Sequence, residues 1–418
     1  MDSESTEQRR SVLLVTDQIP GHQIGAQRSG SALAVSSYID HFNAKSWPVT
    51  VLLLRPRLDF CFARVTNFPY RLRGPGIAKF GRSYFVYSIP SLVAAAGWKV
   101  FSSVLPWMSR YVVRLRDLLR RIRGIAHVLG RMPTHREIEV ARVAARQENP
   151  DVVLYDGIFN VCGSLAAAKH WVITHEVKHL RALSFKRRGY SVLPSDLTQD
   201  KEAAILRSVG NVIAIQSEEA AVFRRLLPQS RVVVVPVPFD QPRHTRPAVL
   251  NSLRCIFVAS GSFHNVDGLR WFLSECWSSI RDTLGATLDI YGSVCLRLGA
   301  LPEGVTAHGV VDDITHVYTT AGVALIPLRV GSGLKVKILE AMAHGVPAVT
   351  TSIGAQGLTH YAPPPFLVED SAQAFSRAVI RIFRDPELQR ALRERSLEVA
   401  REFRPKEAFR EFDEALAQ

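Results

Sequence analysis

Short apolar runs alternate with helical stretches along most of the first half of the chain. The runs at residues 11–17, 49–54, 151–155, 171–174, 211–215 and 231–235 have the composition of buried strands. Between them, residues 32–42, 136–148, 163–168, 202–208 and 218–226 are predicted helices. Near-continuous apolar strands separated by helices are typical of a parallel sheet with both faces covered.

The same alternation starts again after a linker at residues 237–247 that contains three prolines. Apolar runs at 253–259, 287–291, 305–308, 323–326 and 348–351 alternate with helices, one of them over 268–280. Helices dominate from residue 371, and residues 405–417 place Phe409, Phe412 and Leu416 on one side of a final helix. We therefore expect a first domain over 1–240, a second domain over 241–398 and a C-terminal helix over 399–418 that packs back on the first domain.

Residues 55–131 interrupt the pattern of the first domain and are read as an insertion. This segment holds fifteen Lys and Arg against two Asp, and so carries most of the net charge of +14. Residues 110–123 predict a basic amphipathic helix with arginines at 114, 116, 120 and 121. Arg114, Arg116, Arg120 and Arg121 suit an anionic membrane surface or a phosphate-bearing acceptor. The alternative is a helix packed on the domain with solvated arginines. No nucleic-acid-binding motif accompanies the charge, so no nucleic-acid partner is predicted.

Composition narrows the class of protein further. A chain of 418 residues, 47% hydrophobic and 22% charged, is typical of a globular protein of about two domains. Its five cysteines are scattered and include no CxxC pair, which argues against a zinc site or a disulfide framework and favours a reducing cytosol. We expect no signal peptide and no spanning helix, and hence a cytoplasmic protein. The basic stretch would associate it peripherally with the inner face of the cell membrane.

The most informative stretch is residues 326–358, in which a buried strand leads through a glycine-containing loop into a helix that carries Lys335, Lys337 and Glu340. Gly331 and Gly333 allow the backbone to approach a ligand closely, and the helix start offers unpaired N–H groups. Lys337 and Glu340 are three residues apart and so share one face of the helix. A cation near the loop with a carboxylate one turn further along suits a diphosphate attached to a ribose. The alternative is a tight strand–helix corner with solvated lysines.

A second candidate follows the strand at 171–174, where His175 and Glu176 stand at its C-terminal end. Ligands of open α/β sheets bind at that edge, and a histidine there can donate to a sugar hydroxyl or a phosphate. The alternative is a structural histidine. Glycines also follow the first strand, Gly25 among them, but their spacing does not match GxGxxG, so a dinucleotide site is not favoured.

The residues GSGLKVKILEAMAHGVPAVTTSIGAQGL resemble the donor-nucleotide signature of GT-B glycosyltransferases, most closely glycosyltransferase family 4. Further segments stand in the order of that family: TDQIP with GAQRSG, THE, VASGSFHNVDGLRWF, YGS and HGVVDD. The resemblance covers nearly the whole chain except residues 55–131. It implies an α/β GT-B fold, in which two doubly wound Rossmann-like domains face a cleft and the C-terminal helix crosses back to the first domain. The first domain would then lie on the acceptor side, and the second would bind the nucleotide-sugar donor.

The resemblance implies a role for each residue of the motif. Glu340 would bind the ribose hydroxyls of the nucleotide, and Lys337, with Lys335 in a lesser role, would neutralise the donor diphosphate. His175 would contact the donor sugar, so that His175, Lys337 and Glu340 form the catalytic set. Other residues expected at the donor are Gly25, Gly261, Gly309, Val310, Arg329, Gly331, Ser332, Gly333 and Lys335.

This chain departs from the family pattern at two places. Ser332 stands where the first of two glutamates eight positions apart is often found, which affects recognition of the donor sugar. Ser262 and Val266 stand where many members have a basic pair, so Lys337 and Arg329 are expected to carry more of the phosphate charge. Asn265, in the same loop, is expected to have a positional role.

The implied activity is metal-independent, retaining transfer of a hexosyl-type sugar from a nucleotide-diphosphate sugar, with no cofactor beyond that co-substrate. The expected acceptor is a glycan or lipid-linked molecule of cell-envelope polysaccharide biosynthesis. Two alternatives remain open: a soluble enzyme acting on a small-molecule acceptor, and a non-catalytic glycosyltransferase-like partner in envelope assembly. A nucleotide-sugar epimerase is disfavoured, because the sequence offers no clear acid and base carboxylates for it.

Overall fold

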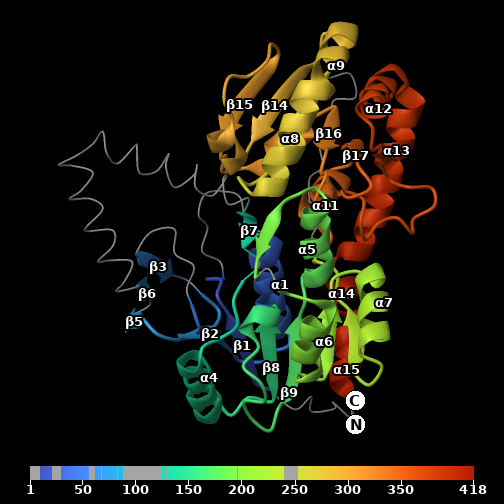
Figure 1. Cartoon of the computed structure of the whole chain (residues 1–418). Helices are drawn as coiled ribbons and strands as arrows, with labels where there is room; N and C mark the ends of the chain where they lie inside the picture. Colours follow the sequence, from blue (N-terminus) through green and yellow to red (C-terminus); the bar gives the residue numbers. More distant parts are fainter. Residues whose placement is uncertain are drawn as a thin grey trace, which may run out of the picture.

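Two parallel sheets form two domains stacked one above the other (Figure 1). The computed structural model describes residues 10–20, 30–55, 62–66, 68–81, 83–87, 125–128, 130–194, 196–239 and 253–418. The predictions made for Gly25, Arg114, Arg116, Arg120 and Arg121 lie outside these residues. The expectation of two doubly wound domains is confirmed.

The first domain is built on a seven-stranded parallel sheet. Its order is β12 (Arg231–Val234), β11 (Asn211–Ala214), β9 (Lys169–Ile173), β8 (Val152–Asp156), β1 (Val12–Thr16), β2 (Val49–Leu53) and β4 (Arg71–Arg73). Every residue of β1, β2 and β8 is buried, because helices cover both faces of the sheet. These helices are α1 (Gly30–Ala44), α4 (His135–Glu148), α5 (Lys178–Lys186), α6 (Gln199–Arg207) and α7 (Ser217–Leu226).

Several helices begin at side chains that accept hydrogen bonds from their first free N–H groups. Thr134 and Glu137 form a reciprocal capping box at the start of α4. Thr198 caps α6, and Ser371 and Asp385 cap two helices of the second domain. Local sequence thus fixes where these helices start, independently of the core.

The segment that interrupts the alternation contributes small sheets in its described part. β3 (Phe62–Thr66), β6 (Ser83–Tyr87) and β5 (Ile77–Phe80) form an antiparallel sheet in that order. β7 (Ile125–Val128) pairs in parallel with β10 (Ser191–Leu193). Across the described residues, no helix is both long enough and apolar enough to cross a membrane.

The second domain repeats the architecture on a six-stranded parallel sheet. Its order is β15 (Val305–Gly309), β14 (Thr287–Tyr291), β13 (Arg254–Val258), β16 (Val323–Ile326), β17 (Ala348–Thr350) and β18 (Leu367–Val368). The helices are α8 (Phe263–Glu275), α9 (Trp277–Leu284), α10 (Ile314–Thr319), α11 (Val336–Ala343), α12 (Ala372–Arg384) and α13 (Pro386–Ala400). Short 3-10 turns follow β8 (Ile158–Asn160) and β14 (Ser293–Arg297).

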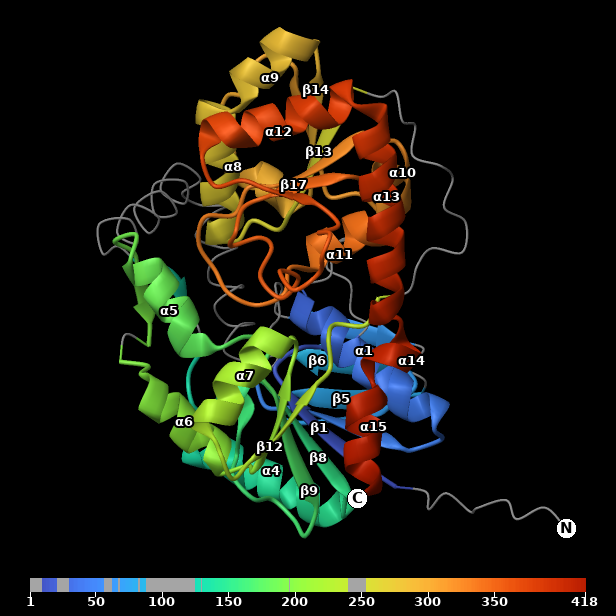
Figure 2. The ribbon, with the colours of Figure 1, turned by 90° about the vertical axis from the view of Figure 1, so that its right-hand side faces the viewer.

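The C-terminus returns to the first domain, as predicted. From α13 the chain continues through a 3-10 turn (Arg401–Phe403) into α14 (Pro405–Ala408) and α15 (Arg410–Ala417), which lie beside the first domain (Figure 2). Phe409 and Phe412 are fully buried in the first domain's core, where the ring of Phe412 lies 5.2 Å from that of Trp171. This apolar contact holds the C-terminal helix, which follows the second domain in the chain, against the first domain.

The structure corrects three predicted elements. Residues 163–168 form bends rather than a helix, because Gly163 has a left-handed φ of +77° and its carbonyl accepts the Tyr155 hydroxyl at 2.5 Å. The helix predicted over 268–280 is two helices divided at Cys276, whose φ of −113° departs from helical values. Lys335 was placed within a helix but is the residue before its first turn.

Candidate functional site

The predicted strand–loop–helix forms as β16, a loop containing Gly331 and Gly333, and α11. Both glycines have positive φ angles, +131° and +81°, in the region that favours glycine. A side chain at Gly333 would also collide, because a Cβ atom there would lie 2.9 Å from the His175 carbonyl oxygen. The loop of the second domain therefore lies directly against the end of β9 in the first.

Hydrogen bonds between the domains hold this loop. The Gly331 N–H donates to Ser184 Oγ on α5 at 3.1 Å, and Ser332 Oγ donates to a carboxylate oxygen of Glu176 at 3.0 Å. Glu176 also pairs with Lys178 at 2.6 Å and Arg181 at 2.5 Å. Burial raises the pKa of Glu176, but the two cations outweigh it and hold that pKa well below its usual range. Ser332 thus meets an ionised carboxylate supplied by the other domain.

Lys337 projects from the first turn of α11 toward the loop that follows β13. Its ammonium donates to Asn265 Oδ1 at 2.5 Å and lies 5.4 Å from the centre of the Phe257 ring. Burial lowers the pKa of Lys337 to about 7, with Glu340 acting in the opposite direction. Asn265 is itself fixed, because its amide donates to the carbonyl and hydroxyl oxygens of Ser260 at 3.0 and 3.1 Å.

Glu340 lies one turn further along the same face of α11. The Tyr318 hydroxyl of α10 donates to its carboxylate at 2.8 Å. Burial raises the pKa of Glu340, while the Tyr318 hydrogen bond and the nearby Lys337 oppose that rise. The two predicted charges are therefore coupled to each other, and each is oriented by a neutral partner from another loop or helix.

Lys335 belongs to different surroundings from Lys337. Its ammonium donates to the Gly333 carbonyl and to Gln356 Oε1, the latter at 3.3 Å. Burial, followed by the repulsion of Arg181, lowers the pKa of Lys335 to about 8. The carboxylates that act on it are Glu176, Glu219 and Glu218, all in the first domain. Lys335 therefore faces the junction between the domains.

His175 follows β9 in a left-handed conformation, with φ of +51°. Its Nε2 is hydrogen-bonded to Asp156, a buried carboxylate at the end of β8, which also accepts the Thr16 hydroxyl at 2.5 Å. The carboxylate fixes the imidazole's orientation and tautomer. Asp156 and Thr16 were missed in the sequence, although each ends a parallel strand at the edge where ligands bind.

The other predicted donor residues come from loops at the same edge of the second sheet. Gly261 donates its N–H to Ser293 Oγ at 2.9 Å, and Gly309 donates to Cys295 Sγ at 3.3 Å. Val310, after β15, is 43% exposed. Arg329 lies apart from Lys337: its guanidinium is 5.8 Å from the Trp271 ring and 3.9 Å from Asp267.

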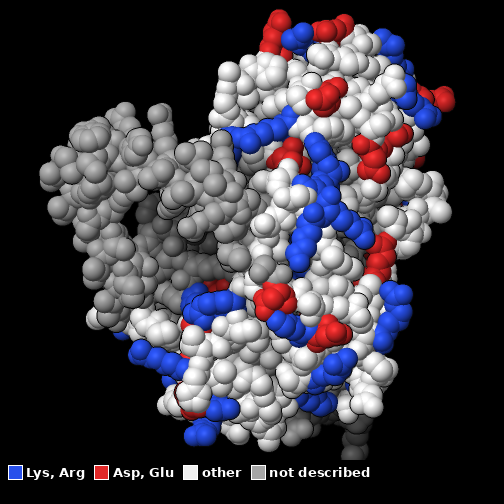
Figure 3. Space-filling model, in the orientation of Figure 1, with Lys and Arg blue, Asp and Glu red and all other residues white. Residues whose placement is uncertain are grey.

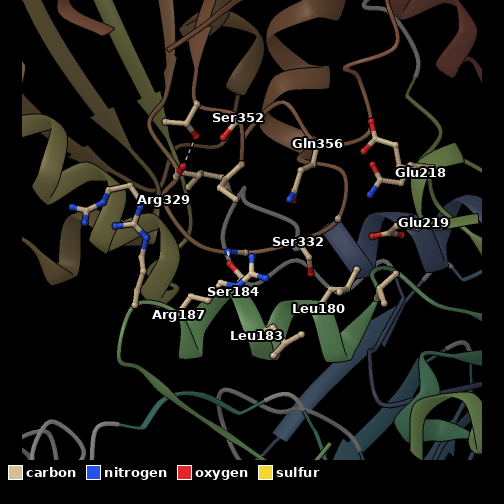
Figure 4. A pocket seen from close by; sticks show the side chains of 18 of the residues that line it. Leu180, Leu183, Ser184, Arg187, Glu218, Glu219, Arg329, Ser332, Ser352 and Gln356 are labelled. Atoms are coloured by element: carbon tan, nitrogen blue, oxygen red, sulfur yellow. Dashed lines mark hydrogen bonds between the residues drawn. The ribbon is translucent and has the colours of Figure 1, made fainter. Parts of the chain in front are cut away.

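A cavity of about 780 Å³ opens between the domains on the α5 and α7 side of the loop (Figure 4). Four of the predicted residues line it, namely Arg329, Gly331, Ser332 and Gly333. Lys337, Glu340 and His175 do not line it. Among the described residues, no group of three or more His, Cys, Asp or Glu side chains is arranged to hold a metal ion.

Comparison with known proteins agrees with this architecture. Residues 254–385 match the family model described as "Glycosyl transferases group 1". No curated protein sequence matches the chain.

Solved structures match over almost the full length. One is sucrose-phosphate synthase from Thermosynechococcus elongatus, with a TM-score of 0.63 and 13% sequence identity over 98% of this chain and 99% of that one. Another is Anabaena HepE in complex with UDP and glucose, with a TM-score of 0.59 and 12% identity over 98% of this chain and 99% of that one. WaaG, a glycosyltransferase involved in lipopolysaccharide biosynthesis, also matches, with a TM-score of 0.57 and 11% identity over 96% of this chain and 99% of that one. The chain spans 59% of the length of the pneumococcal O-GlcNAc transferase GtfA.

The two stacked parallel-sheet domains and the returning C-terminal helix define the GT-B class. Within that fold class, the second domain is the part of this chain that matches the group 1 glycosyl transferase model.

Proposed function

We propose that this protein transfers a sugar from a nucleoside-diphosphate sugar to an acceptor hydroxyl. The observation that carries the proposal is the pairing of Lys337 and Glu340 on one face of α11, directly behind a glycine loop in a group 1 domain. A diphosphate would supply an anionic group for Lys337, and the ribose attached to it would supply hydroxyl donors for Glu340.

The leaving group in such a transfer is a nucleoside diphosphate, whose negative charge grows as the glycosidic bond breaks. Lys337 would meet that charge with its ammonium, and the first N–H groups of α11 would add to it. A bound diphosphate would also raise the pKa of Lys337 above its present value of about 7 and keep it protonated. Glu340 would accept hydrogen bonds from the ribose hydroxyls.

The donor sugar would lie toward the first domain, where His175 and Ser332 stand close together across the domain contact. His175, oriented by Asp156, would donate to a sugar hydroxyl. Ser332 and Glu176 would together supply a hydroxyl and a carboxylate where the expected glutamate is missing. Domain closure over the donor would exclude water that hydrolyses it. We propose that transfer is retaining and needs no metal.

For the acceptor, we propose a glycan or lipid-linked molecule of cell-envelope polysaccharide biosynthesis, reached by a cytoplasmic enzyme at the inner membrane face. The fold similarity to WaaG, a glycosyltransferase involved in lipopolysaccharide biosynthesis, supports this choice. The basic stretch at Arg114, Arg116, Arg120 and Arg121 supplies the charge for an anionic surface.

A panel of nucleoside diphosphates and nucleotide sugars tests the donor site by thermal shift. A ligand that binds the native state raises the melting temperature with its concentration. We expect one nucleotide class to stabilise the wild type and not Glu340→Ala, with Glu394→Ala, an exposed glutamate of α13, as the control. Stabilisation by none of these ligands would instead support a non-catalytic partner.

A further inference from the structure

Glu219 on α7 is a buried carboxylate whose hydrogen bonding is incomplete. It is 4% exposed, and neither carboxylate oxygen receives a hydrogen bond of normal geometry from the described residues. It lines the cavity between the domains (Figure 4). Gln216, also in the lining, has a buried side-chain oxygen with no donor. Buried acceptors without donors are rare in folded proteins and need an explanation.

Lys335, the cation that acts on Glu219, and the two cations beside Glu176 all have other partners. Lys335 donates to Gly333 and Gln356, whereas Lys178 and Arg181 pair with Glu176. Burial raises the pKa of Glu219 to about 7, and the charge of Glu176 raises it further. The Gln216 side chain and the Val177 backbone N–H, as hydrogen-bond donors, and the charge of Lys335 oppose that rise. The neighbouring Glu218 differs, since it accepts hydrogen bonds from Gly357 and Thr359. A molecule in the cavity that carries hydroxyl or N–H groups would complete the hydrogen bonding of Glu219.

The opposite end of the cavity is cationic. Arg187 and Arg188, just beyond α5, are exposed and line it together with Arg329. In Figure 4, Arg187 and Arg329 stand at one end and Glu219 at the other. In Figure 3, Lys and Arg side chains gather on the surface near where α5 meets α8. This end suits a phosphate or a carboxylate group.

An apolar wall joins the two ends. Leu180 and Leu183, one turn apart on α5, are 40% and 44% exposed and line the cavity, as does Val222 of α7. The C–H face of a sugar ring packs on such a surface. The cavity volume of about 780 Å³ accommodates one or two sugar residues.

We propose that this cavity binds an anionic sugar, its hydroxyls donating to Glu219 and Gln216 and its phosphate or carboxylate facing Arg187 and Arg329. Resting on the proposed function, this sugar belongs to the acceptor, because no residue of α11 lines the cavity. A sugar phosphate and a sugar acid share this chemistry, and the test below separates them.

Calorimetric titration without nucleotide tests the proposal. The probes are glucose 6-phosphate, mannose 6-phosphate, glucosamine 6-phosphate and glucuronate, with glucose and inorganic phosphate as references. We expect at least one anionic sugar to bind wild type at least about tenfold more tightly than either reference. Preference for the phosphates or for glucuronate identifies the anionic group. No anionic sugar binding, or inorganic phosphate binding as tightly as the sugar phosphates, would overturn the proposal.

Variants locate the bound sugar. Glu219→Leu should weaken binding at least about tenfold and, because it removes an unpaired buried carboxylate, raise the melting temperature of the unliganded protein. Arg187→Gln should reduce the preference for anionic sugars, whereas exposed Arg225→Gln on α7 should not. Unchanged affinity in Glu219→Leu contradicts the site. Should that variant fail to fold, Glu219→Gln replaces it, with weaker binding again expected.

Glu340→Ala separates this inference from the proposed function. If anionic sugars bind this variant as tightly as wild type while nucleotides do not, the two sites are distinct, as proposed. If no nucleotide binds wild type but anionic sugars still do, the proposed transfer fails while the sugar site stands. If Glu340→Ala abolishes sugar binding as well, the inference is wrong.

Discussion

The two sides of the loop between β16 and α11 differ in how their charged groups are satisfied. On the α11 side, Lys337 and Glu340 each have a neutral partner, Asn265 and Tyr318. On the cavity side, the hydrogen bonding of Glu219 is incomplete within the described residues. The first arrangement is oriented before any ligand arrives, whereas the second lowers the stability of the empty protein. Each arrangement therefore predicts a different response to substitution.

The largest expected effect is on the α11 side. Lys337→Met removes the cation proposed to face the diphosphate and should weaken nucleoside diphosphate binding by about 2–5 kcal/mol, or roughly 30- to 4000-fold. Arg225→Gln should have no such effect. Wild-type binding should also weaken above pH 7, because the pKa of Lys337 is lowered to about 7 and the ammonium is then lost before binding. Titration calorimetry at several pH values measures both, and pH-independent affinity would contradict this role.

The next effect lies on the cavity side and concerns stability. The folded-state pKa of Glu219, about 7, is above its ordinary value of 4.5, so the folded protein holds a proton that the unfolded chain releases. The proton on Glu219 therefore contributes about 3 kcal/mol to the free energy of unfolding below about pH 4.5, and this contribution is lost as the pH rises through 7. Glu219→Leu should therefore gain stability over wild type as the pH rises through this range. Denaturant unfolding at pH 5 and 7.5 measures the change, and a constant difference would show that Glu219 is not desolvated.

A smaller effect is expected where the two sides meet. Gly333→Ala would place a Cβ 2.9 Å from the His175 carbonyl oxygen at a φ of +81°. Gly285→Ala is the matched control, with φ of +68° and no atom within 4 Å. We expect the Gly333 variant to lose about 1–3 kcal/mol more stability than the control, because it also pushes the domains apart. Equal losses would show that the domain contact contributes nothing beyond backbone strain.

The smallest expected effect is at Asn265, which holds Lys337 without contacting the ligand in the proposed arrangement. Asn265→Ala should weaken nucleoside diphosphate binding by about 1 kcal/mol, roughly fivefold. Losing this acceptor should also shift the pH dependence of binding that Lys337 causes. Asn265→Asp, which places a carboxylate against the ammonium, should raise the pKa of Lys337 and move the loss of binding to higher pH. An unchanged pH profile in Asn265→Ala would assign Asn265 a structural role.

Features that depend on neighbouring residues in the chain, such as the strands, the helices and the residues that share a helical face, were predictable from the sequence. The strand–helix alternation predicted both domains, and the three-residue spacing of Lys337 and Glu340 predicted their shared helical face. The error at residues 163–168 is also local, because a left-handed Gly163 ended a pattern that otherwise resembled a helix. The partners of the charges come from remote segments: Asn265 is 72 residues from Lys337, and Asp156 is 19 from His175.

The cavity could not be predicted for the same reason. Its walls come from α5, α7 and the loops after β16 and β17, which only the domain packing brings together. Glu219 stands next to Glu218 in the sequence, and nothing in that pair indicates which one is partnered. Burial and hydrogen bonding, rather than residue type, make Glu219 a candidate for ligand binding.

The most direct test of the central claim is a titration of UDP, GDP and ADP into wild type, Glu340→Gln and Glu219→Leu. Glu340→Gln keeps an acceptor for Tyr318, so its fold should be retained. We expect one nucleotide to bind wild type and Glu219→Leu with similar affinity and to bind Glu340→Gln at least about tenfold more weakly. Equal binding to wild type and Glu340→Gln, or binding to none of the three proteins, would contradict a nucleotide-sugar site on α11.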